Sequence, residues 1–243
     1  MQSNTIVCVH DLVKTFHGRE VISNCNMNVQ KGTIYGFLGQ NGAGKTTVLK
    51  LLVGLLQPTS GQIEIDGVNA RNNYQVILKN IGSIIETPMF YEHLTATQNL
   101  EIHLSYMQLP HNDISETLHI VGLNSAEQPV SEFSLGMRQR LGIARAIIHK
   151  PKLLLLDEPI NGLDPMGIRE MRELFISLVH DRGMTIIVSS HILGEIEHIA
   201  DTIGVIVNGN IVQEVALSSI KEKYPNGLED YFFTVMNGGT TLA

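Results

Sequence analysis

One short glycine-rich segment constrains this chain more than any other feature. It matches the G-x-x-x-x-G-K-[ST] phosphate-binding loop and reads Gly39-Gln40-Asn41-Gly42-Ala43-Gly44-Lys45-Thr46, followed by Thr47. The apolar residues 34–38 before it have a strand pattern, and residues 47–52 after it have a helical pattern. Because the motif requires a strand, a loop and a helix in this order, we interpret the segment as a phosphate site. The alternative is a chance glycine-rich turn.

The residue types in the loop suit a phosphorylated ligand that carries a metal ion. Glycines such as Gly42 and Gly44 let backbone N–H groups turn inward around phosphate oxygens. Lys45 adds a positive charge for the β- and γ-phosphates, and Thr46 offers a hydroxyl to Mg²⁺. The loop therefore predicts a nucleoside triphosphate and Mg²⁺ as cofactors.

Composition excludes several classes of protein. The 243 residues, 43% of them apolar, are enough for one large domain or for a core with a subdomain. A net charge of −7 argues against a nucleic-acid partner, because phosphate backbones attract basic surfaces. The two cysteines, Cys8 and Cys25, do not make a disulfide framework and are expected to be free thiols.

The chain is also expected to be cytoplasmic. No apolar run reaches the roughly 20 residues that span a bilayer. Residues 1–4 lack the basic and apolar regions of a signal peptide. A membrane location would therefore require a partner that holds the chain there.

The order of patterns predicts an α/β fold with a mixed, largely parallel sheet. Residues 153–156 are four leucines, which is typical of a parallel strand buried on both faces, and Thr185–Ser190 is a second such strand. Strands that alternate with helices imply a parallel sheet. Further strands are expected at residues 6–9, 21–22, 62–66 and 81–85, and a hairpin around Asn208-Gly209 within residues 202–215.

The change from strand-like to helical patterns along the chain also predicts how it is divided into subdomains. Helical periodicity replaces strand signals over residues 87–150, which we interpret as an inserted helical subdomain with a helix over residues 141–149. Residues 1–86 and 151–215 would then form the core, and residues 216–243 an appendage. The phosphate loop and its helix are expected to end at Pro58.

Two carboxylates, Asp157 and Glu158, follow the four-leucine strand directly. In open α/β sheets ligands bind outside the carboxyl ends of the strands, so both are expected beside the phosphate loop. Asp157 suits a contact to Mg²⁺, direct or in its second sphere, and Glu158 suits a general base that takes a proton from water. The alternative is an acidic loop after a core strand.

His191 and Asp164 follow the strands of the same predicted sheet. A neutral imidazole at His191 can hydrogen-bond a γ-phosphate or the attacking water, although a lone histidine is usually structural. Asp164 before Pro165 predicts an N-cap and a first helical residue, which does not exclude a second role at an interface.

Ser134 and Gly136 place a hydroxyl and open backbone at the start of another helix. The N-terminus of a helix is a natural anion site. The alternative is an ordinary N-cap that precedes a basic surface helix.

Taken in order, the phosphate loop, the Ser134 segment, the Asp157-Glu158 pair, the Asp164 loop and His191 resemble the ATP-binding cassette ATPases, the nucleotide-binding subunits of ABC transporters. The resemblance covers nearly the whole chain. Each motif alone is weak to moderate, whereas the ordered set is highly specific. A plain P-loop kinase or GTPase would lack the signature helix and the terminal histidine.

The resemblance implies a P-loop NTPase (RecA-like) core with an N-terminal antiparallel β subdomain and the inserted helical subdomain. It implies ATP as the nucleotide and a homodimer that encloses two ATP molecules. In such dimers the signature residues, here Ser134 and Gly136, cap the γ-phosphate held by the other copy, and Asp164 belongs to the same nucleotide-binding set. It further implies a permease partner that holds the chain at the inner face of the membrane.

Two more residues gain a role only through the resemblance. Phe16 matches the aromatic that stacks on adenine, with a core phenylalanine as the alternative. Glu86 stands where the family carries a glutamine that touches Mg²⁺ and senses the permease. A carboxylate binds the metal more strongly than an amide but adds repulsion near phosphates.

Residues 85–95 around Glu86 look like the branch that exports or protects against bacitracin and lantibiotics. The signature Ser134-Leu135-Gly136-Met137-Arg138-Gln139-Arg140 also resembles that branch, and departs from L-S-G-G-Q at Phe133, Leu135 and Met137. The other possibilities are another exporter, a soluble cassette ATPase of translation or DNA repair, and a non-hydrolysing cassette. The single cassette, the lack of heptad repeats and the negative net charge argue against a soluble ATPase of translation or DNA repair. Glu158 and His191 argue against a non-hydrolysing cassette.

Overall fold

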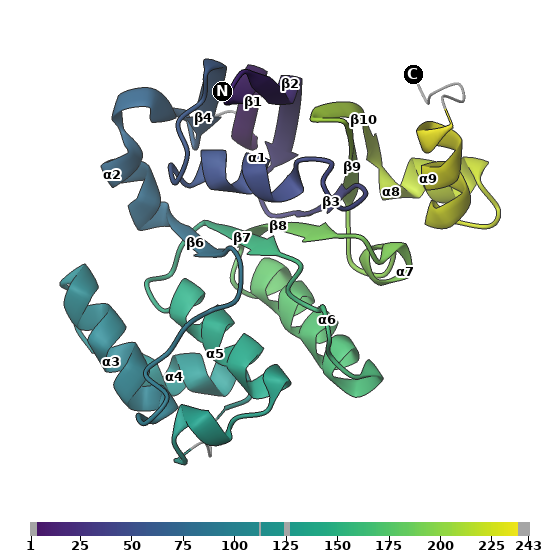
Figure 1. Ribbon diagram of the computed structural model, residues 1–243. Helices are drawn as coiled ribbons and strands as arrows, with labels where there is room; N and C mark the ends of the chain where they lie inside the picture. Colours follow the sequence, from purple (N-terminus) through teal and green to yellow (C-terminus); the bar gives the residue numbers. More distant parts are fainter. Residues whose placement is uncertain (1–3, 112, 124–126, 238–243) are drawn as a thin grey trace.

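The computed structural model of the chain describes residues 4–111, 113–123 and 127–237 (Figure 1). Two sheets organise the molecule. The first is antiparallel and consists of β1 (Thr5–Phe16), β2 (Arg19–Gln30), β4 (Ser60–Ile65) and β5 (Val68–Asn69), in the order β2-β1-β4-β5.

The second sheet has six strands, of which five are parallel and β10 runs antiparallel at one edge. Its order is β10-β9-β3-β8-β7-β6. This confirms the predicted α/β class with a mixed sheet. The strands are β3 (Ile34–Leu38), β6 (Ile81–Ile84), β7 (Leu153–Asp157), β8 (Thr185–Ser190), β9 (Thr202–Val207) and β10 (Asn210–Ala216).

The central strand β3 determines where the glycine loop lies in the fold. All five of its residues are buried, and it pairs in parallel with β8 on one side and β9 on the other. Continuous apolar sequence is what a strand covered on both faces requires. The loop therefore leaves the carboxyl end of the strand in the middle of the sheet.

Helix α1 (Lys45–Leu52) lies between the two sheets (Figure 1). Its apolar side chains Val48, Leu49, Leu51 and Leu52 belong to the core cluster that β1, β2 and β4 share with one face of the second sheet. The helix ends six residues before Pro58, where the sequence predicted its end. Gly54 adopts a left-handed φ of +72°, a conformation that favours glycine and commonly ends helices.

The other face of the six-stranded sheet carries most of the remaining helices (Figure 1). In the described part of residues 87–150 there are helices and no strand, in line with the predicted helical texture. The helices are α2 (Tyr74–Ile77), α3 (Ala96–Met107), α4 (Ile114–Ile120), α5 (Leu135–Ile147), α6 (Pro165–His180), α7 (Leu193–Ile196), α8 (Leu217–Lys223) and α9 (Leu228–Met236), with 3-10 turns at Ala70–Asn72, Leu78–Asn80 and Val130–Glu132.

Helix α5 corrects the prediction of a helix over residues 141–149. It begins at Leu135, because Ser134 Oγ accepts a hydrogen bond from the N–H of Met137 and caps it. Its last turn lies directly against β6: a Cβ on Gly82 would stand 2.0 Å from the carbonyl oxygen of Ala146. Glycine at that position lets helix and strand approach backbone to backbone.

Strand boundaries also differ from the predictions. Strands β1 and β2 each span 12 residues, far longer than the expected segments, because register shifts let apolar and polar stretches continue in one ladder. The hairpin of β9 and β10 is confirmed. Asn208 and Gly209 both have positive φ, +48° and +81°, as the favoured two-residue turn requires.

Three other expectations concern the thiols, the membrane and the appendage. Cys8 and Cys25 are both free, as predicted. Among the described residues, none of the helices combines the length and the apolar character needed to cross a membrane. The predicted appendage contains α8 and α9, and its residues 238–243 lie outside the described residues.

Candidate functional site

The glycine loop connects β3 to α1 and exposes the start of that helix. Gly42 and Gly44 have φ of +81° and +114°, and Gly44 is the N-cap of α1. The first backbone hydrogen bond of the helix runs from the N–H of Val48 to Gly44 O. The N–H groups of the preceding turn have no intrahelical acceptor, so they are available to an anion.

The turn between β9 and β10 supports the loop from behind. The N–H of Ala43 donates to the carbonyl of Gln40, and the N–H of Gly209 donates to the carbonyl of Ala43. A Cβ on Gly39 would stand 2.7 Å from the carbonyl oxygen of Ile206. The sheet therefore holds the loop from Gly39 to Gly44 by backbone contacts and leaves its open side free.

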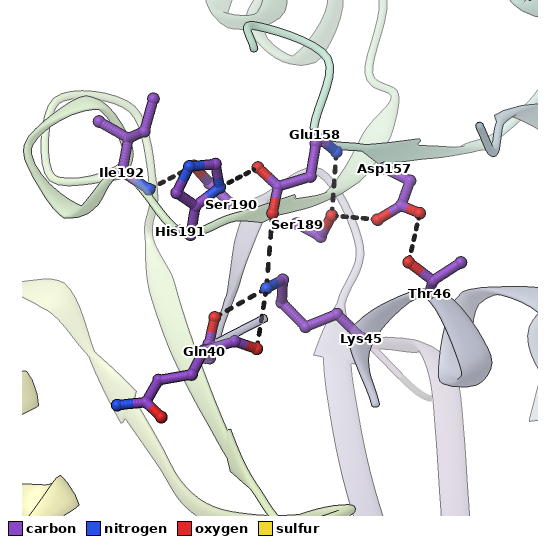
Figure 2. Close-up of polar contacts among 10 residues, drawn as sticks. Gln40, Lys45, Thr46, Asp157, Glu158, Ser189, Ser190, His191 and Ile192 are labelled. Atoms are coloured by element: carbon purple, nitrogen blue, oxygen red, sulfur yellow. Dashed lines mark hydrogen bonds and ion pairs between the residues drawn. The ribbon is translucent and has the colours of Figure 1, made fainter. Parts of the chain in front are cut away.

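Lys45 is a nearly buried cation whose ion pair with a carboxylate is long. Its side chain is 6% exposed, and Nζ donates to the carbonyl oxygens of Gly39 at 2.7 Å and Gln40 at 3.4 Å. The nearest carboxylate oxygen is Glu158 Oε1, 3.4 Å from Nζ (Figure 2). Burying a charge is costly unless it is well paired, so this ammonium is suited to receive further anionic oxygens.

Asp157 is held by two hydroxyl groups at the end of β7 (Figure 2). Thr46 Oγ1 donates to Asp157 Oδ2 at 2.6 Å, and Ser189 Oγ donates to Oδ1 at 2.6 Å. The first contact joins the phosphate loop to the carboxylate pair, as the sequence predicted. It brings together two hard oxygen ligands of the kind that Mg²⁺ prefers.

Glu158 stands between Lys45 and His191 (Figure 2). Its Oε2 lies 2.8 Å from His191 Nδ1, and its N–H donates to Ser189 Oγ at 3.0 Å. The backbone adopts a left-handed φ of +50°, which few non-glycine residues do. Strained backbone of this kind clusters at functional sites, and here it directs the carboxylate toward the loop.

The structure places Ser134, Gly136 and Asp164 together, away from that cluster. They line one cavity of about 420 Å³ between the start of α5 and the start of α6. Asp164 is the predicted N-cap, since its Oδ1 accepts from the N–H of Gly167 and Pro165 follows. This cavity contains no residue of the glycine loop, so within one chain the two sets of residues do not form one site.

Phe16 and Glu86 each lie at or just beyond the end of a strand; Phe16 is partly exposed and Glu86 is exposed. Phe16 ends β1, belongs to neither hydrophobic core, and has Lys14 Nζ 4.9 Å from its ring centroid, so the alternative of a core phenylalanine is wrong. Glu86 follows β6, is 69% exposed, and its Oε1 lies 2.5 Å from Lys50 Nζ.

These residues fit a magnesium–triphosphate complex. The free N–H groups and the ammonium of Lys45 match anionic phosphate oxygens. Thr46 and Asp157 supply two oxygen ligands, and the described residues contain no group of three histidine, cysteine or acidic residues that could hold a metal alone. Mg²⁺ typically takes one or two protein oxygens and completes its shell with phosphates and water.

Sequence reasoning missed Ser189 and Lys50. Ser189 is fully buried and contacts both carboxylate residues, but a serine inside an apolar strand gives no signal by itself. Ser189 lies near the end of β8 and pairs with Asp157 at the end of β7. Its position near the end of a predicted parallel strand is the feature from which its place in the site could have been predicted. Lys50 is one helical turn beyond Thr46, and only the fold brings it to Glu86.

Comparisons with known proteins agree with this geometry. The family profile described as "ABC transporter" matches residues 22–161. The chain is 50% identical to the bacitracin transport ATP-binding protein BcrA of Bacillus licheniformis, over 93% of this chain and 74% of the relative. It is 47% identical to the lantibiotic transport ATP-binding protein SrtF of Streptococcus pyogenes, over 85% of this chain and 89% of the relative.

A solved structure of the ATP-binding subunit of an ABC transporter superposes with a TM-score of 0.83, 27% identity, and coverage of 96% of this chain and all of the other. The chain therefore belongs to the ABC transporter family, as an ATP-binding subunit that hydrolyses ATP.

Proposed function

We propose that this ATPase powers a permease that exports, or confers immunity to, a peptide antibiotic of the bacitracin or lantibiotic type. The observation that carries the proposal is the identity of 50% and 47% to subunits named for bacitracin and lantibiotic transport, across most of this chain. The solved ATP-binding subunit of an ABC transporter shares the fold at a much lower identity of 27%.

In the proposed mechanism Glu158 is the general base. Its carboxylate is placed at the carboxyl edge of the sheet, 3.4 Å from Lys45 and 2.8 Å from His191. When phosphate oxygens engage Lys45, this weak ion pair is released and the carboxylate becomes free to accept a proton from water. His191 orients that carboxylate and offers its other ring nitrogen to the γ-phosphate or the water.

The metal set of the proposal is Thr46, Asp157 and Glu86. Thr46 and Asp157 already lie in contact, and Glu86 follows the strand next to Asp157. Mg²⁺, when bound, neutralises charge on the phosphates. Phe16 is the proposed adenine platform, which its partly exposed ring at the end of β1 supports.

A second copy of the chain completes the site in this proposal. Ser134, Gly136 and Asp164 line a cavity of their own, which is consistent with residues that serve the nucleotide of another chain. Leu135 and Met166 on the same cavity are 46% and 61% exposed, and a dimer would cover them. A hydrolysis-blocked protein that stayed monomeric in saturating ATP would contradict this arrangement.

The permease is proposed to bind the helical region, near residues 89–94. Met89, Tyr91 and Tyr106 are 84%, 47% and 79% exposed and line one groove of about 350 Å³ beside α3 and α5. Exposed apolar groups gathered in a groove are typical of a protein-binding site. Contact there would hold the subunit at the cytoplasmic face of the membrane.

Glu158→Gln tests the proposal. We expect ATP binding and ATP-dependent dimerisation to persist, because an amide retains the shape and removes a negative charge near the phosphates. Hydrolysis should fall on the order of 10²- to 10⁴-fold, the usual worth of a general base. Cells that express the variant together with its permease should lose protection against bacitracin or a lantibiotic, while the subunit still copurifies with the permease.

Glu229→Gln, on the exposed surface of α9, is the matched control and should change none of these properties. Unaltered protection with the hydrolysis-blocked variant would refute hydrolysis-driven export. Loss of hydrolysis with no effect on any peptide antibiotic would leave the ATPase in place and refute the proposed cargo class.

A further inference from the structure

The ion pair between Lys50 and Glu86 joins two elements that both lead to the nucleotide site. Lys50 Nζ and Glu86 Oε1 are 2.5 Å apart, and their side chains are 28% and 69% exposed. Lys50 is in the last turn of α1, the helix that begins at the phosphate loop. Glu86 lies two residues beyond the end of β6.

The position of Lys50 relative to Thr46 follows from helix geometry. Residues four apart lie on one face of a helix, about 5–6 Å apart at Cβ. Lys50 therefore stands one turn beyond the Thr46 hydroxyl, which donates to Asp157. A carboxylate paired with Lys50 is therefore held close to Thr46 and Asp157, the proposed metal ligands, but not in contact with the metal position between them.

The sheet brings Glu86 to the same place from the other side. Ile84 of β6 pairs with Leu156 of β7, so the two parallel strands end side by side. Asp157 follows Leu156, and Glu86 follows Ile84 by two residues. Glu86 would thus add a third negative charge to those of Asp157 and Glu158 unless a cation compensated it.

Glu86 has little else to hold its carboxylate. Among the described residues, Lys50 is the partner found for its side chain. The backbone of Glu86 adopts a left-handed φ of +67°, rare for a residue with a side chain, which sets the direction in which the carboxylate leaves the strand. An exposed side chain with one partner can exchange that partner quickly.

We propose that Lys50 is a positioning residue for Glu86: it holds and neutralises the carboxylate one helical turn from Thr46, and so controls how readily Glu86 reaches the metal edge. The inference rests on the proposed metal role of Glu86. A neutral glutamine at position 86 would have no charge for a cation to neutralise. We therefore link the lysine at position 50 to the presence of a carboxylate at position 86.

The proposal predicts a specific dependence between two substitutions. Lys50→Met frees the carboxylate, so the apparent affinity of the nucleotide-bound protein for a divalent metal should rise about three- to tenfold. In a Glu86→Gln background the same change should raise it less than about twofold, because only the distant charge is lost. Lys50→Arg keeps a cation at the site and should behave like the unmodified protein.

The measurement is calorimetric titration of the purified chain with AMP-PNP at a series of fixed free Mn²⁺ concentrations, which requires no turnover. Lys152→Met is the matched control, because it also removes a lysine from a surface ion pair, with Asp66, away from the site. Thermal unfolding with and without nucleotide confirms that each variant is folded.

The outcomes separate the inference from the function on which it rests. A positioning role for Lys50 is supported if Lys50→Met raises the apparent affinity for Mn²⁺ only when Glu86 is present, and if Lys50→Arg does not raise it. Equal effects of Lys50→Met in both backgrounds, or none in either, overturn the inference. If Glu86→Gln leaves the Mn²⁺ dependence unchanged even when Lys50 is replaced by methionine, the metal role of Glu86 fails as well.

Discussion

At the scale of single residues, Ser189 connects the two carboxylates of the site. Its hydroxyl donates to Asp157 Oδ1 and accepts from the N–H of Glu158, and it is fully buried. One hydroxyl therefore orients the proposed metal ligand and restrains the backbone of the proposed base. Removing a partner of buried polar groups leaves them unsatisfied, which costs about 1–3 kcal/mol.

We expect Ser189→Ala to lower ATP hydrolysis about ten- to a hundredfold, since small displacements of catalytic groups have large effects on rate. The free energy of unfolding should fall by about 1–3 kcal/mol. Steady-state hydrolysis and urea denaturation measure the two effects. Ser83→Ala in strand β6 of the same sheet, where the side chain is exposed, serves as control. Equal hydrolysis by both variants would show that Ser189 does not position the carboxylates.

At the scale of elements, two helix N-termini have the same chemistry and different surroundings. Ser134 caps α5 by accepting from the N–H of Met137, and Thr95 caps α3 by accepting from the N–H of Gln98. Ser134 faces the cavity proposed as a dimer contact, whereas Thr95 belongs to a capping box with Gln98. The pair can therefore separate a capping role from an interface role.

Ser134→Ala and Thr95→Ala should each reduce the free energy of unfolding by about 1 kcal/mol, the usual cost of a lost N-cap. Only Ser134→Ala should also weaken the ATP-dependent dimer of the Glu158→Gln protein. Analytical ultracentrifugation in ATP distinguishes them. If the two variants dimerise equally well, Ser134 is an ordinary N-cap.

The packing of α3 on α5 makes a further prediction, about pH. Burial lowers the pKa of His103 on α3 to about 4, helped by the positive charge of Arg145 on α5 and by His149. Because the folded pKa lies below the unfolded value of 6.5, the neutral imidazole contributes stability above pH 6.5. That stability is lost as the pH falls through 4.

His103→Leu should flatten this dependence, since leucine does not titrate. Solvent screening limits the effect, because the imidazole is only about half buried, and we expect about 1 kcal/mol between pH 6.5 and pH 4. Urea denaturation at several pH values measures it. Parallel pH profiles for the variant and the unmodified protein would contradict the prediction.

At the scale of the whole molecule, the sequence predicts what periodic patterns and turn chemistry encode. Buried parallel strands such as β3 and β8 read as continuous apolar runs, and the Asn208-Gly209 turn demands positive φ. The Thr46–Asp157 contact followed from the rule that ligands bind at the carboxyl ends of strands.

What could not be predicted depends on contacts between distant segments. The end of α1 is set by the backbone of Gly54, where a side chain would also meet Tyr74, and the sequence placed that end at Pro58. Lys50 reaches Glu86 across 36 positions of the chain, and nothing in the pattern of either segment encodes that distance. The roles of Ser134, Gly136 and Phe16 remain predictions, because they depend on a nucleotide and a second chain.

The backbone contact between Gly82 and Ala146 has a mechanical consequence. Helix α5 carries Ser134 at its first turn and touches β6 at its last, where no side chain intervenes. The 13-residue helix is roughly 20 Å long, so a tilt about this junction would be amplified at the end that carries Ser134. Movement of a few degrees beside the sheet would therefore displace the far end of the helix by an ångström or more.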